Sequence, residues 1–209
     1  FNLLLSKYFM KMNELTLIIP AKSEAESLPI VLDELKEYNY QIDIVLHATD
    51  TDTIEAIKEY NVNVVYQKNL GYGDALIYGT KNCKTKYFCI FNADGSFDPS
   101  EIEQMHETLQ KKQLDFIFAS RYQDNSGSED DTIITLFGNY IFTYIGKIFF
   151  KLNISDILYT FIIGKTGQAN ILDLKQKDFS FCVELPIKAK IMKMKLGCIN
   201  SYERKRIAG

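Results

Sequence analysis

The sequence predicts an α/β fold with a mainly parallel sheet and helices on both faces, and two patterns carry that prediction. Short apolar runs rich in β-branched residues alternate with segments in which apolar residues recur at helical spacing. Each alternation is typical of a strand, a right-handed crossover helix and the next parallel strand. The chain has 209 residues, of which 46% are hydrophobic, so we expect residues 1–209 to form a single domain.

The predicted elements follow in order from the N-terminal side. Residues 1–13 precede the first pattern and are expected to be peripheral. Strands are predicted at 15–20, 42–46, 62–66 and 87–91, each followed by a helix, at 24–38, 53–60, 73–80 and 99–112. A fifth strand is predicted at 115–119. Because ligands bind such sheets at the carboxyl ends of the strands, the residues directly after each strand are the first candidates for a site.

The second half of the chain changes character. Residues 123–131 are polar and acidic and contain glycine, which predicts a mobile loop. The segment 132–152 is apolar and aromatic, with a narrow polar stripe that recurs every four residues: Thr135, Asn139, Thr143, Lys147 and Lys151. Its apolar face is broader than one helix of a small domain usually needs. We favour a helix lying at a membrane surface over a buried core helix or a spanning helix, which the two lysines disfavour. A further helix is predicted at 181–193 and a strand at 198–202.

Charge and cysteine content exclude several classes. The net charge of -3 argues against a general nucleic-acid binder, which needs a basic surface, so we expect no nucleic-acid partner. A local basic cluster of Arg204, Lys205 and Arg206 follows the last predicted strand, where it meets a phosphate-bearing partner or forms a solvated tail. The four cysteines form no CxxC pair and the two histidines are far apart, which disfavours structural zinc. With no signal-peptide pattern, we expect reduced cysteines and a cytoplasmic location.

The residues after the fourth predicted strand are the most informative. Asn92, Asp94 and Ser96 follow this strand directly, and Pro99 starts the next helix. A carboxylate in such a turn can hold a divalent cation, which bridges a nucleotide diphosphate and neutralises charge on the leaving group. The alternative is an Asx-type turn that caps the following helix.

Four motifs in a fixed order make the chain resemble a known family. They are L-I-I-P-A-K-S-E at 17–24, N-L-G-Y-G-D-A-L at 69–76, N-A-D-G-S-F-D-P at 92–99 and A-S-R-Y at 119–122. Together they resemble the family-two glycosyltransferases with the GT-A fold, particularly the dolichol- and polyprenyl-phosphate sugar transferases. Further similarity occurs at Asp156, at F-C-V-E-L in 181–185 and at Y-E-R-K-R in 202–206, so the resemblance covers nearly the whole chain.

The resemblance assigns the donor-binding residues. It implies that Pro20, Ala21 and Glu24 contact the nucleoside, with Glu24 accepting hydrogen bonds from the base or ribose. It also implies that Gly71 and Gly73 let the backbone approach the donor. The alternatives are a helix first-turn acid for Glu24 and a plain strand-to-helix turn for the glycines. The glycines form no dinucleotide fingerprint, because they follow the third strand and not the first.

Three positions depart from the family pattern. Asn92 stands where most relatives carry the first aspartate of the metal motif, so Asp94 is expected to hold Mg or Mn while Asn92 helps position the donor. Ser23 replaces the usual asparagine. The stretch H-A-T-D-T-D at 47–52 replaces two adjacent nucleoside-binding aspartates, and Asp50, with Asp52 nearby, is the substitute.

The remaining roles concern phosphate and the acceptor. By resemblance, Arg121 meets a donor or acceptor phosphate, for which a guanidinium is geometrically suited, although a surface ion pair is the alternative. Asp156 is the candidate base or acceptor-positioning group, and Asp94, Asp156 and Arg121 form the candidate catalytic set. Arg204 and Arg206 are assigned with Arg121 to an acceptor phosphate. A lipid phosphate is already anionic at neutral pH, so such an acceptor needs no strong base.

The resemblance thus implies an inverting transfer of a hexose from a UDP- or GDP-sugar to polyprenyl phosphate or another membrane-linked acceptor. The enzyme would need a divalent cation and lie peripherally at the inner face of the membrane. One alternative is a degenerate domain that binds nucleotide sugar, or scaffolds a membrane complex, without catalysis. Another is a nucleotidyltransferase, which normally has a glycine-rich, basic loop after the first strand that residues 21–24 lack.

Overall fold

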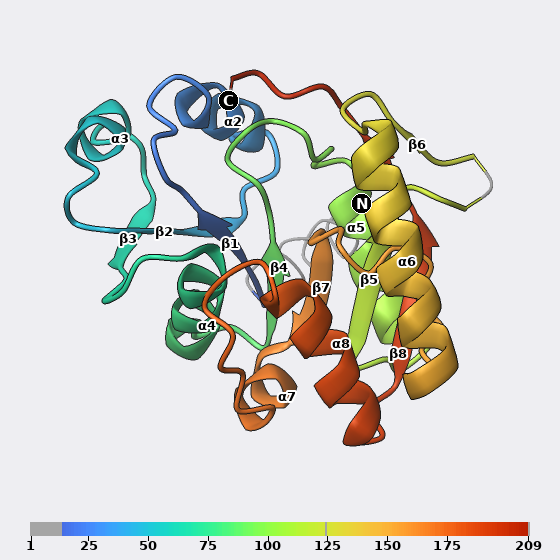
Figure 1. Ribbon diagram of the computed structural model, residues 1–209. Helices are drawn as coiled ribbons and strands as arrows, with labels where there is room; N and C mark the ends of the chain where they lie inside the picture. Colours follow the sequence, from blue (N-terminus) through green and yellow to red (C-terminus); the bar gives the residue numbers. More distant parts are fainter. Residues whose placement is uncertain (1–13, 124, 209) are drawn as a thin grey trace, which may run out of the picture.

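The computed structural model describes residues 14–123 and 125–208, so the predicted peripheral segment 1–13 lies outside the described residues. A seven-stranded sheet with the strand order β3-β2-β1-β4-β7-β5-β8 forms the centre (Figure 1). The strands are β1 (Leu15–Pro20), β2 (Gln41–Leu46), β3 (Asn63–Tyr66), β4 (Tyr87–Ile90), β5 (Phe116–Ser120), β7 (Ile162–Lys165) and β8 (Leu196–Asn200). The predicted α/β class and mainly parallel sheet are confirmed.

One strand of the seven-stranded sheet was not predicted and changes the strand order. β7 is antiparallel to both of its neighbours and lies between β4 and β5, with Tyr87 opposite Lys165 and Phe116 opposite Gly164. Position 164 requires glycine, because a Cβ atom on this residue would lie 2.5 Å from the Phe116 ring and 2.8 Å from the Phe88 ring. β5 and β8 then pair in parallel.

Helices cover both faces of the sheet, as the sequence predicts. Their bounds are α2 (Leu28–Leu35), α3 (Thr51–Ala56), α4 (Tyr72–Asn82), α5 (Glu101–Lys111), α6 (Ile133–Phe150), α7 (Thr166–Ile171) and α8 (Phe181–Ile191). One apolar core contains residues of α2 and α5, and a second contains residues of α4, α7 and α8. In α2 the buried residues Leu28, Val31, Leu32 and Leu35 recur at helical spacing and form an inward face.

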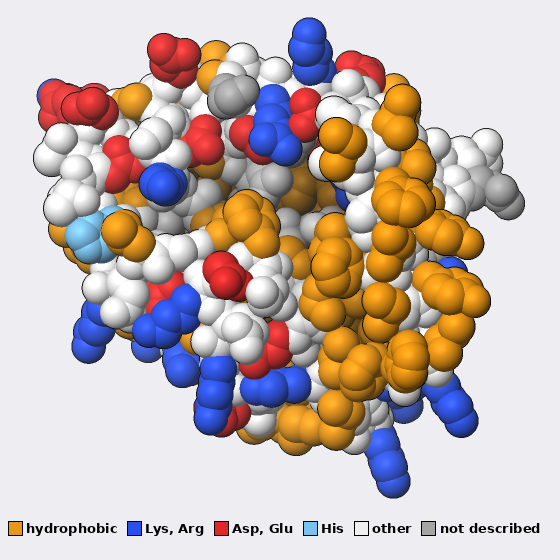
Figure 2. All heavy atoms as spheres, in the orientation of Figure 1, with side chains coloured by type: hydrophobic (Ala, Val, Ile, Leu, Met, Phe, Trp, Pro, Cys, Tyr) orange, Lys and Arg blue, Asp and Glu red, His pale blue; other side chains and the backbone are white. Residues whose placement is uncertain are grey.

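The helix α6 has the opposite orientation. Thr132 and Thr135 form a capping box at its start, and only Asn139, Thr143 and Gly146 are buried along its 18 residues. Its large apolar side chains face outward as a continuous band (Figure 2). Within the described chain it is the one helix long and apolar enough to cross a membrane, and just 17% of it is buried. Among the described residues α6 is therefore a surface helix and not a core helix.

The segment predicted as a mobile loop is paired with the last strand of the chain. β6 (Gly127–Ser128) and β9 (Tyr202–Glu203) form a small parallel sheet. The amide of Glu129 also donates to the carbonyl of Glu203 at 2.9 Å. Apart from residue 124, which is not described, the stretch 123–131 is thus tied to β9, and its mobility stays a prediction. This small sheet stands beside the N-terminal end of α6 (Figure 1).

Candidate active site

A pocket of about 840 Å³ opens at the carboxyl ends of β1, β2 and β4. It is lined by residues from the loops after these strands, by Arg121 after β5 and by Arg206 near the end of the chain. Charged side chains of both signs surround the hollow (Figure 2). The pocket therefore lies at the edge of the sheet that the strand order predicts.

The loop after β1 is held by the loop after β2. Ser23 has a φ of 60°, and its amide donates to the Asp50 carboxylate at 2.7 Å. The other Asp50 oxygen accepts from the Thr53 amide at 3.4 Å and caps α3. Asparagine adopts this left-handed conformation more readily than serine, which gives a physical reason for the asparagine that the resemblance leads us to expect here. Asp50 lines the pocket, but both of its oxygens already bind backbone amides.

Glu24 presents a half-buried carboxylate to the pocket. It accepts a hydrogen bond from the Ser27 hydroxyl. Burial raises the pKa of Glu24, the Ser27 hydrogen bond lowers it in part, and the negative charge of Asp94 raises it further. An acid in this environment takes up a proton more easily than an exposed glutamate. Pro20 and Ala21 line the same wall, as the resemblance implies.

The turn after β4 is an Asx-type turn, whereas the metal role of Asp94 stays a prediction. One Asp94 oxygen accepts from the Ser96 amide at 2.9 Å and from its hydroxyl at 2.6 Å, which is an Asx-type turn. The other oxygen lies 3.6 Å from Nε of Arg206. Asn92 accepts from the Tyr72 hydroxyl at 3.4 Å and also lines the pocket. The turn therefore leaves one Asp94 oxygen directed to a cationic neighbour.

These residues fit a cation that arrives with a phosphate ligand better than a resident metal. Within residues 14–123 and 125–208, no three His, Cys, Asp or Glu side chains are grouped as a metal site. Mg²⁺ keeps several waters and is commonly held by one or two carboxylates together with substrate phosphates. Asp94 supplies one such carboxylate, so the donor set is sufficient only with a phosphate-bearing ligand.

The pocket is negatively charged overall. Six carboxylates line it against three cations: Glu24, Asp50, Asp52, Asp94, Asp178 and Glu203 against Lys22, Arg121 and Arg206. An anionic ligand would therefore be repelled unless a cation accompanied it.

The two glycines at the start of α4, Gly71 at its N-cap and Gly73 in its first turn, accommodate the chain in front of α8. Gly71 has a φ of 134°, and a Cβ atom on it would lie 2.1 Å from the Lys177 carbonyl oxygen. A Cβ atom on Gly73 would lie 2.3 Å from the carbonyl oxygen of Gln176. Gly71 lines the pocket, whereas Gly73 is not among the residues that do. Close packing of two backbone segments thus accounts for both glycines, and their contact with a donor stays a prediction.

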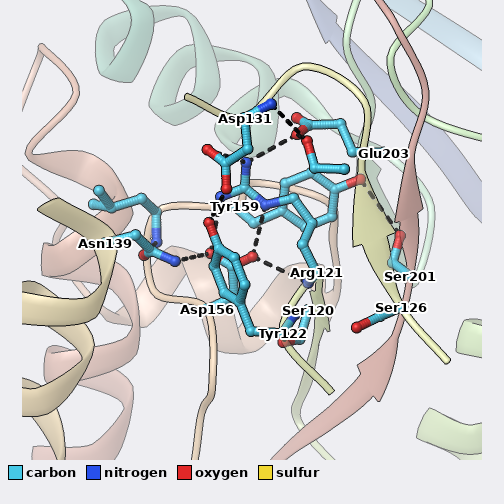
Figure 3. Close-up of polar contacts among 12 residues, drawn as sticks. Ser120, Arg121, Tyr122, Ser126, Asp131, Asn139, Asp156, Tyr159, Ser201 and Glu203 are labelled. Carbon is cyan, nitrogen blue, oxygen red and sulfur yellow. Dashed lines mark hydrogen bonds and ion pairs between the residues drawn. The ribbon is translucent and has the colours of Figure 1, made fainter. Parts of the chain in front are cut away.

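Arg121 is enclosed by carboxylates (Figure 3). Its Nε and Nη2 atoms donate to the two oxygens of Asp156 at 2.8 and 3.1 Å, and Nη1 donates to Glu203 at 2.9 Å. Asp131 lies 3.8 Å away, and the Arg121 side chain is 10% exposed. Burial lowers the pKa of Arg121, but Asp156 and Glu203 outweigh it and raise the pKa overall. This is a buried ion pair, neither a free phosphate-binding fork nor the surface ion pair that was the alternative.

Asp156 lies behind Arg121 and does not line the pocket. It is fully buried and accepts four hydrogen bonds, from the Arg121 amide, Nε and Nη2 and from the Asn139 side chain. A carboxylate with these partners has no path to an acceptor proton in this arrangement. Of the two predicted roles for Asp156, the geometry fits positioning and not base catalysis.

The basic cluster near the end of the chain is divided between two places. Arg204 donates to both oxygens of Glu34 on α2, at 2.8 and 3.0 Å, and is not part of the pocket lining. Arg206 lines the pocket and pairs with Asp130 at 2.7 Å. The structure thus separates two residues that the sequence placed together, because Glu34 draws Arg204 away.

Several pocket and network residues were missed from the sequence. Glu203 and Asp131 reach Arg121 from β9 and from the residue before the cap of α6. Glu203 lies within the Y-E-R-K-R stretch, but neither residue was assigned a role in the site from the sequence. Phe179 stacks on Tyr72 with ring centroids 4.9 Å apart, and both line the pocket. Asn139 carried one signal, since it belongs to the polar stripe of α6.

Comparisons with known proteins agree with this geometry. The family model described as glycosyl transferase family 2 matches residues 16–167. An uncharacterized glycosyltransferase of Mycobacterium tuberculosis is 29% identical over 96 residues, which is 46% of this chain and 44% of that protein, so the match spans less than half of that relative. An uncharacterized protein of Methanocaldococcus jannaschii is 27% identical over 192 residues, 88% of this chain and 79% of that protein.

Solved structures share the fold. Glucosyl-3-phosphoglycerate synthase from Mycobacterium tuberculosis, in complex with Mn²⁺, UDP and glucosyl-3-phosphoglycerate, superposes with a TM-score of 0.74 at 10% identity and covers 98% of this chain and 75% of its own. The same enzyme with Mn²⁺ and UDP-glucose gives a TM-score of 0.69 at 10% identity, covering 98% and 74%. These likenesses confirm the predicted GT-A fold.

Proposed function

Since the chain belongs to glycosyl transferase family 2, we propose that it transfers a hexose from a UDP- or GDP-linked sugar to a membrane-linked phosphate such as polyprenyl phosphate. The transfer inverts the configuration at the sugar carbon, and the protein works at the cytoplasmic face of a membrane. The single observation that carries the donor half of this proposal is the acidic pocket at the strand ends, with Asp94 on its wall.

The charge of the pocket supports a metal-dependent donor. A nucleotide diphosphate is an anion, and the lining carboxylates outnumber the lining cations. Asp94 would hold Mg²⁺ or Mn²⁺, and the bound cation would neutralise charge on the leaving diphosphate. The relatives named as complexes with UDP and either Mn²⁺ or Mg²⁺ support the same chemistry.

The side chains of the chain bind and orient the substrates. Glu24 and Asn92 line the part of the pocket that would hold the donor. There the Glu24 carboxylate accepts hydrogen bonds from sugar or ribose hydroxyls, and the Asn92 amide can accept or donate them. Arg206, which is half exposed, is free to exchange Asp130 for a phosphate oxygen. Asp156 fixes the guanidinium of Arg121 beside the acceptor. A phosphate-monoester acceptor is anionic at neutral pH, so no residue needs to remove a proton from the nucleophile.

The orientation of α6 supports a membrane-linked acceptor. Its exposed face carries side chains such as Phe137, Tyr144 and Phe149, which are 62, 54 and 75% exposed. Burial of such a face at the apolar boundary of a bilayer is favourable, and Lys147 and Lys151 can pair with anionic headgroups. A soluble phosphate-bearing acceptor is the second candidate, because related folds are named as complexes with phosphoglyceric acid.

A thermal-shift panel of nucleotide sugars, each with and without Mn²⁺, tests the donor. We expect one nucleotide class to raise the melting temperature only when Mn²⁺ is present. Transfer is then measured to polyprenyl phosphate in phosphatidylcholine vesicles and, in parallel, to phosphoglycerate in solution. Transfer to phosphoglycerate alone would reject the membrane acceptor. Metal-dependent binding without transfer to either would favour the non-catalytic domain.

A further inference from the structure

Two residues in the middle of the polar stripe of α6, Asn139 and Thr143, face the protein and make its attachments. Asn139 is 1% exposed, and its Nδ2 donates to Asp156 at 2.7 Å while its Oδ1 accepts from the Leu158 amide at 3.1 Å. One turn later, Thr143 accepts from the Ile157 amide at 3.3 Å. The buried residues of α6 are few and include no large apolar side chain. Polar contacts to residues 156–158 therefore attach the middle of the helix to the domain, and Phe150 at its end packs against the second apolar core.

The segment that receives these contacts also shapes the pocket. Leu158, Tyr159 and Thr160 line it directly. The Thr160 hydroxyl lies 2.6 Å from that of Tyr72, which in turn contacts Asn92. Asp156, at the start of this segment, contacts Arg121, whereas Thr160, at its other end, contacts Tyr72 beside the donor turn.

Arg121 is the pocket side chain most dependent on this segment. Figure 3 shows Asn139 and Arg121 on opposite sides of Asp156, each bonded to the same carboxylate. Asp131, directly before α6, approaches the guanidinium from a second direction and accepts from the Thr135 hydroxyl at 2.5 Å. The helix therefore touches the surroundings of Arg121 at two points along one stripe.

We propose that Asn139 is a positioning residue that links α6 to Arg121. When the outward face of α6 binds a membrane surface, Asn139 determines the position of the Arg121 guanidinium in the pocket. The proposal rests on the proposed function, because it takes the outward face of α6 to meet a membrane. When that face is seated, the helix moves or stiffens as a unit, and Asn139 passes the change to Asp156 and hence to the guanidinium. The acceptor side of the pocket then responds to the membrane while the donor loops do not.

Two variants separate transmission from simple tethering. Asn139→Leu removes both side-chain hydrogen bonds at similar volume, whereas Thr143→Val removes one contact from the same stripe to the same segment but leaves Asp156 untouched. Asn139→Gln, which keeps an amide, is the conservative replacement. Amide hydrogen exchange of residues 156–160 is compared with and without vesicles of phosphatidylcholine and phosphatidylglycerol. Donor affinity is measured by calorimetry with Mn²⁺.

We expect vesicles to slow exchange of residues 156–160 in the wild type, in Thr143→Val and, in part, in Asn139→Gln, but not in Asn139→Leu. With polyprenyl phosphate as acceptor, Asn139→Leu should raise KM for the acceptor about tenfold at unchanged donor affinity, because a small displacement of a positioning group costs this much. A wild type whose exchange ignores vesicles, or an Asn139→Leu protein that responds fully, would overturn the proposal.

The outcomes also distinguish this proposal from the proposed function. If no nucleotide sugar is bound or transferred by the wild type, the proposed function fails, and the exchange measurement still decides the coupling. If sugar is transferred but Asn139→Leu and Thr143→Val behave alike, the coupling fails and the proposed function stands. If Asn139→Leu does not fold, Asn139→Gln carries the test, and its response must then lie below that of Thr143→Val.

Discussion

The helices α2 and α6 are both amphipathic, yet they turn opposite faces to the protein. α2 buries Leu28, Val31, Leu32 and Leu35 against the sheet. α6 buries Asn139, Thr143 and Gly146 and exposes its aromatic and aliphatic side chains. The comparison teaches that helical periodicity identifies two faces but does not say which medium each one meets. That depends on what covers the face: for α2 it is the core, whereas the outward face of α6 is exposed among the described residues.

Replacing an apolar side chain by serine should therefore lower the stability of the protein strongly in α2 and only slightly in α6. Leu32 is 2% exposed, and Leu32→Ser should cost about 3–5 kcal/mol of unfolding free energy, because it leaves a cavity and buries a hydroxyl. Ile30→Ser on the exposed side of α2 is the matched control and should be nearly neutral. Urea denaturation measures both.

The corresponding change in α6 replaces three exposed side chains together. Phe137, Tyr144 and Phe149 changed to serine should cost about 1 kcal/mol in total, since exposed substitutions have small effects. The same triple variant should sediment less with phosphatidylglycerol vesicles at unchanged donor affinity. An unfolded triple variant would show that the outward face of α6 is buried in the folded protein. Unchanged sedimentation with vesicles would show that this face does not bind the membrane.

The donor side, which α2 supports, should depend on one charge. Asp94→Ala should lower the Mn²⁺-dependent affinity for nucleotide about a hundredfold or more, near 2.8 kcal/mol. Asn92→Ala should weaken it much less, because it removes a neutral group. Calorimetric titrations with and without Mn²⁺ measure both variants. An Asp94→Ala protein with full metal-dependent affinity would contradict the assignment of the cation to this turn.

The acceptor side, where α6 is attached, should depend on the geometry of one ion pair. Arg121→Lys keeps the charge but loses the paired contact with Asp156, which should cost about 1.5–3 kcal/mol of stability. Arg204→Lys is the matched control: it also pairs with a carboxylate, but Arg204 and Glu34 are 33 and 38% exposed, so its loss should stay below about 1 kcal/mol. Equal losses of unfolding free energy in the two variants would show that the burial of the Arg121 ion pair does not increase its contribution to stability.

The smallest effect concerns pH on the donor side. Because the pKa of Glu24 is raised, its carboxylate is protonated at a higher pH than an ordinary glutamate. If ionised Glu24 accepts hydrogen bonds from the donor, affinity should fall by less than about tenfold as pH decreases through that raised pKa. Glu24→Gln should have weaker affinity at neutral pH and lose this dependence. The affinity at a series of pH values decides, and an identical profile for both proteins would exclude the role.

Much of the donor side could be predicted from the sequence, because its signals are local. Apolar runs and helical spacing locate the strands and helices up to β5, and the short turn around Asp94 lies next to its strand. The family pattern adds Glu24 and the loop before α2. These features involve residues close in the chain, so a stretch of about ten residues contains the signal that predicts each one.

The acceptor side could not be predicted in the same way, because its contacts are distant in sequence. Arg121 reaches Glu203, and Arg204 reaches Glu34 across 170 positions. Gly73 is explained by the backbone of residue 176, which no turn motif indicates. β7 is the four-residue strand I-I-G-K, and its antiparallel direction follows from its neighbours and not from its own composition.

The position of β7 also constrains how the chain acquires its fold. β4 and β5 follow one another in sequence but have no shared edge, because β7 separates them. Until residues 162–165 are available, β4 ends a four-stranded sheet with a free edge that carries Phe88 and Cys89, and β5 has no partner. Such non-local pairing slows folding and leaves an edge open to association. During synthesis on the ribosome, β7 is therefore the strand that covers this edge and joins β5 to the sheet, and β8 pairs with β5 afterwards.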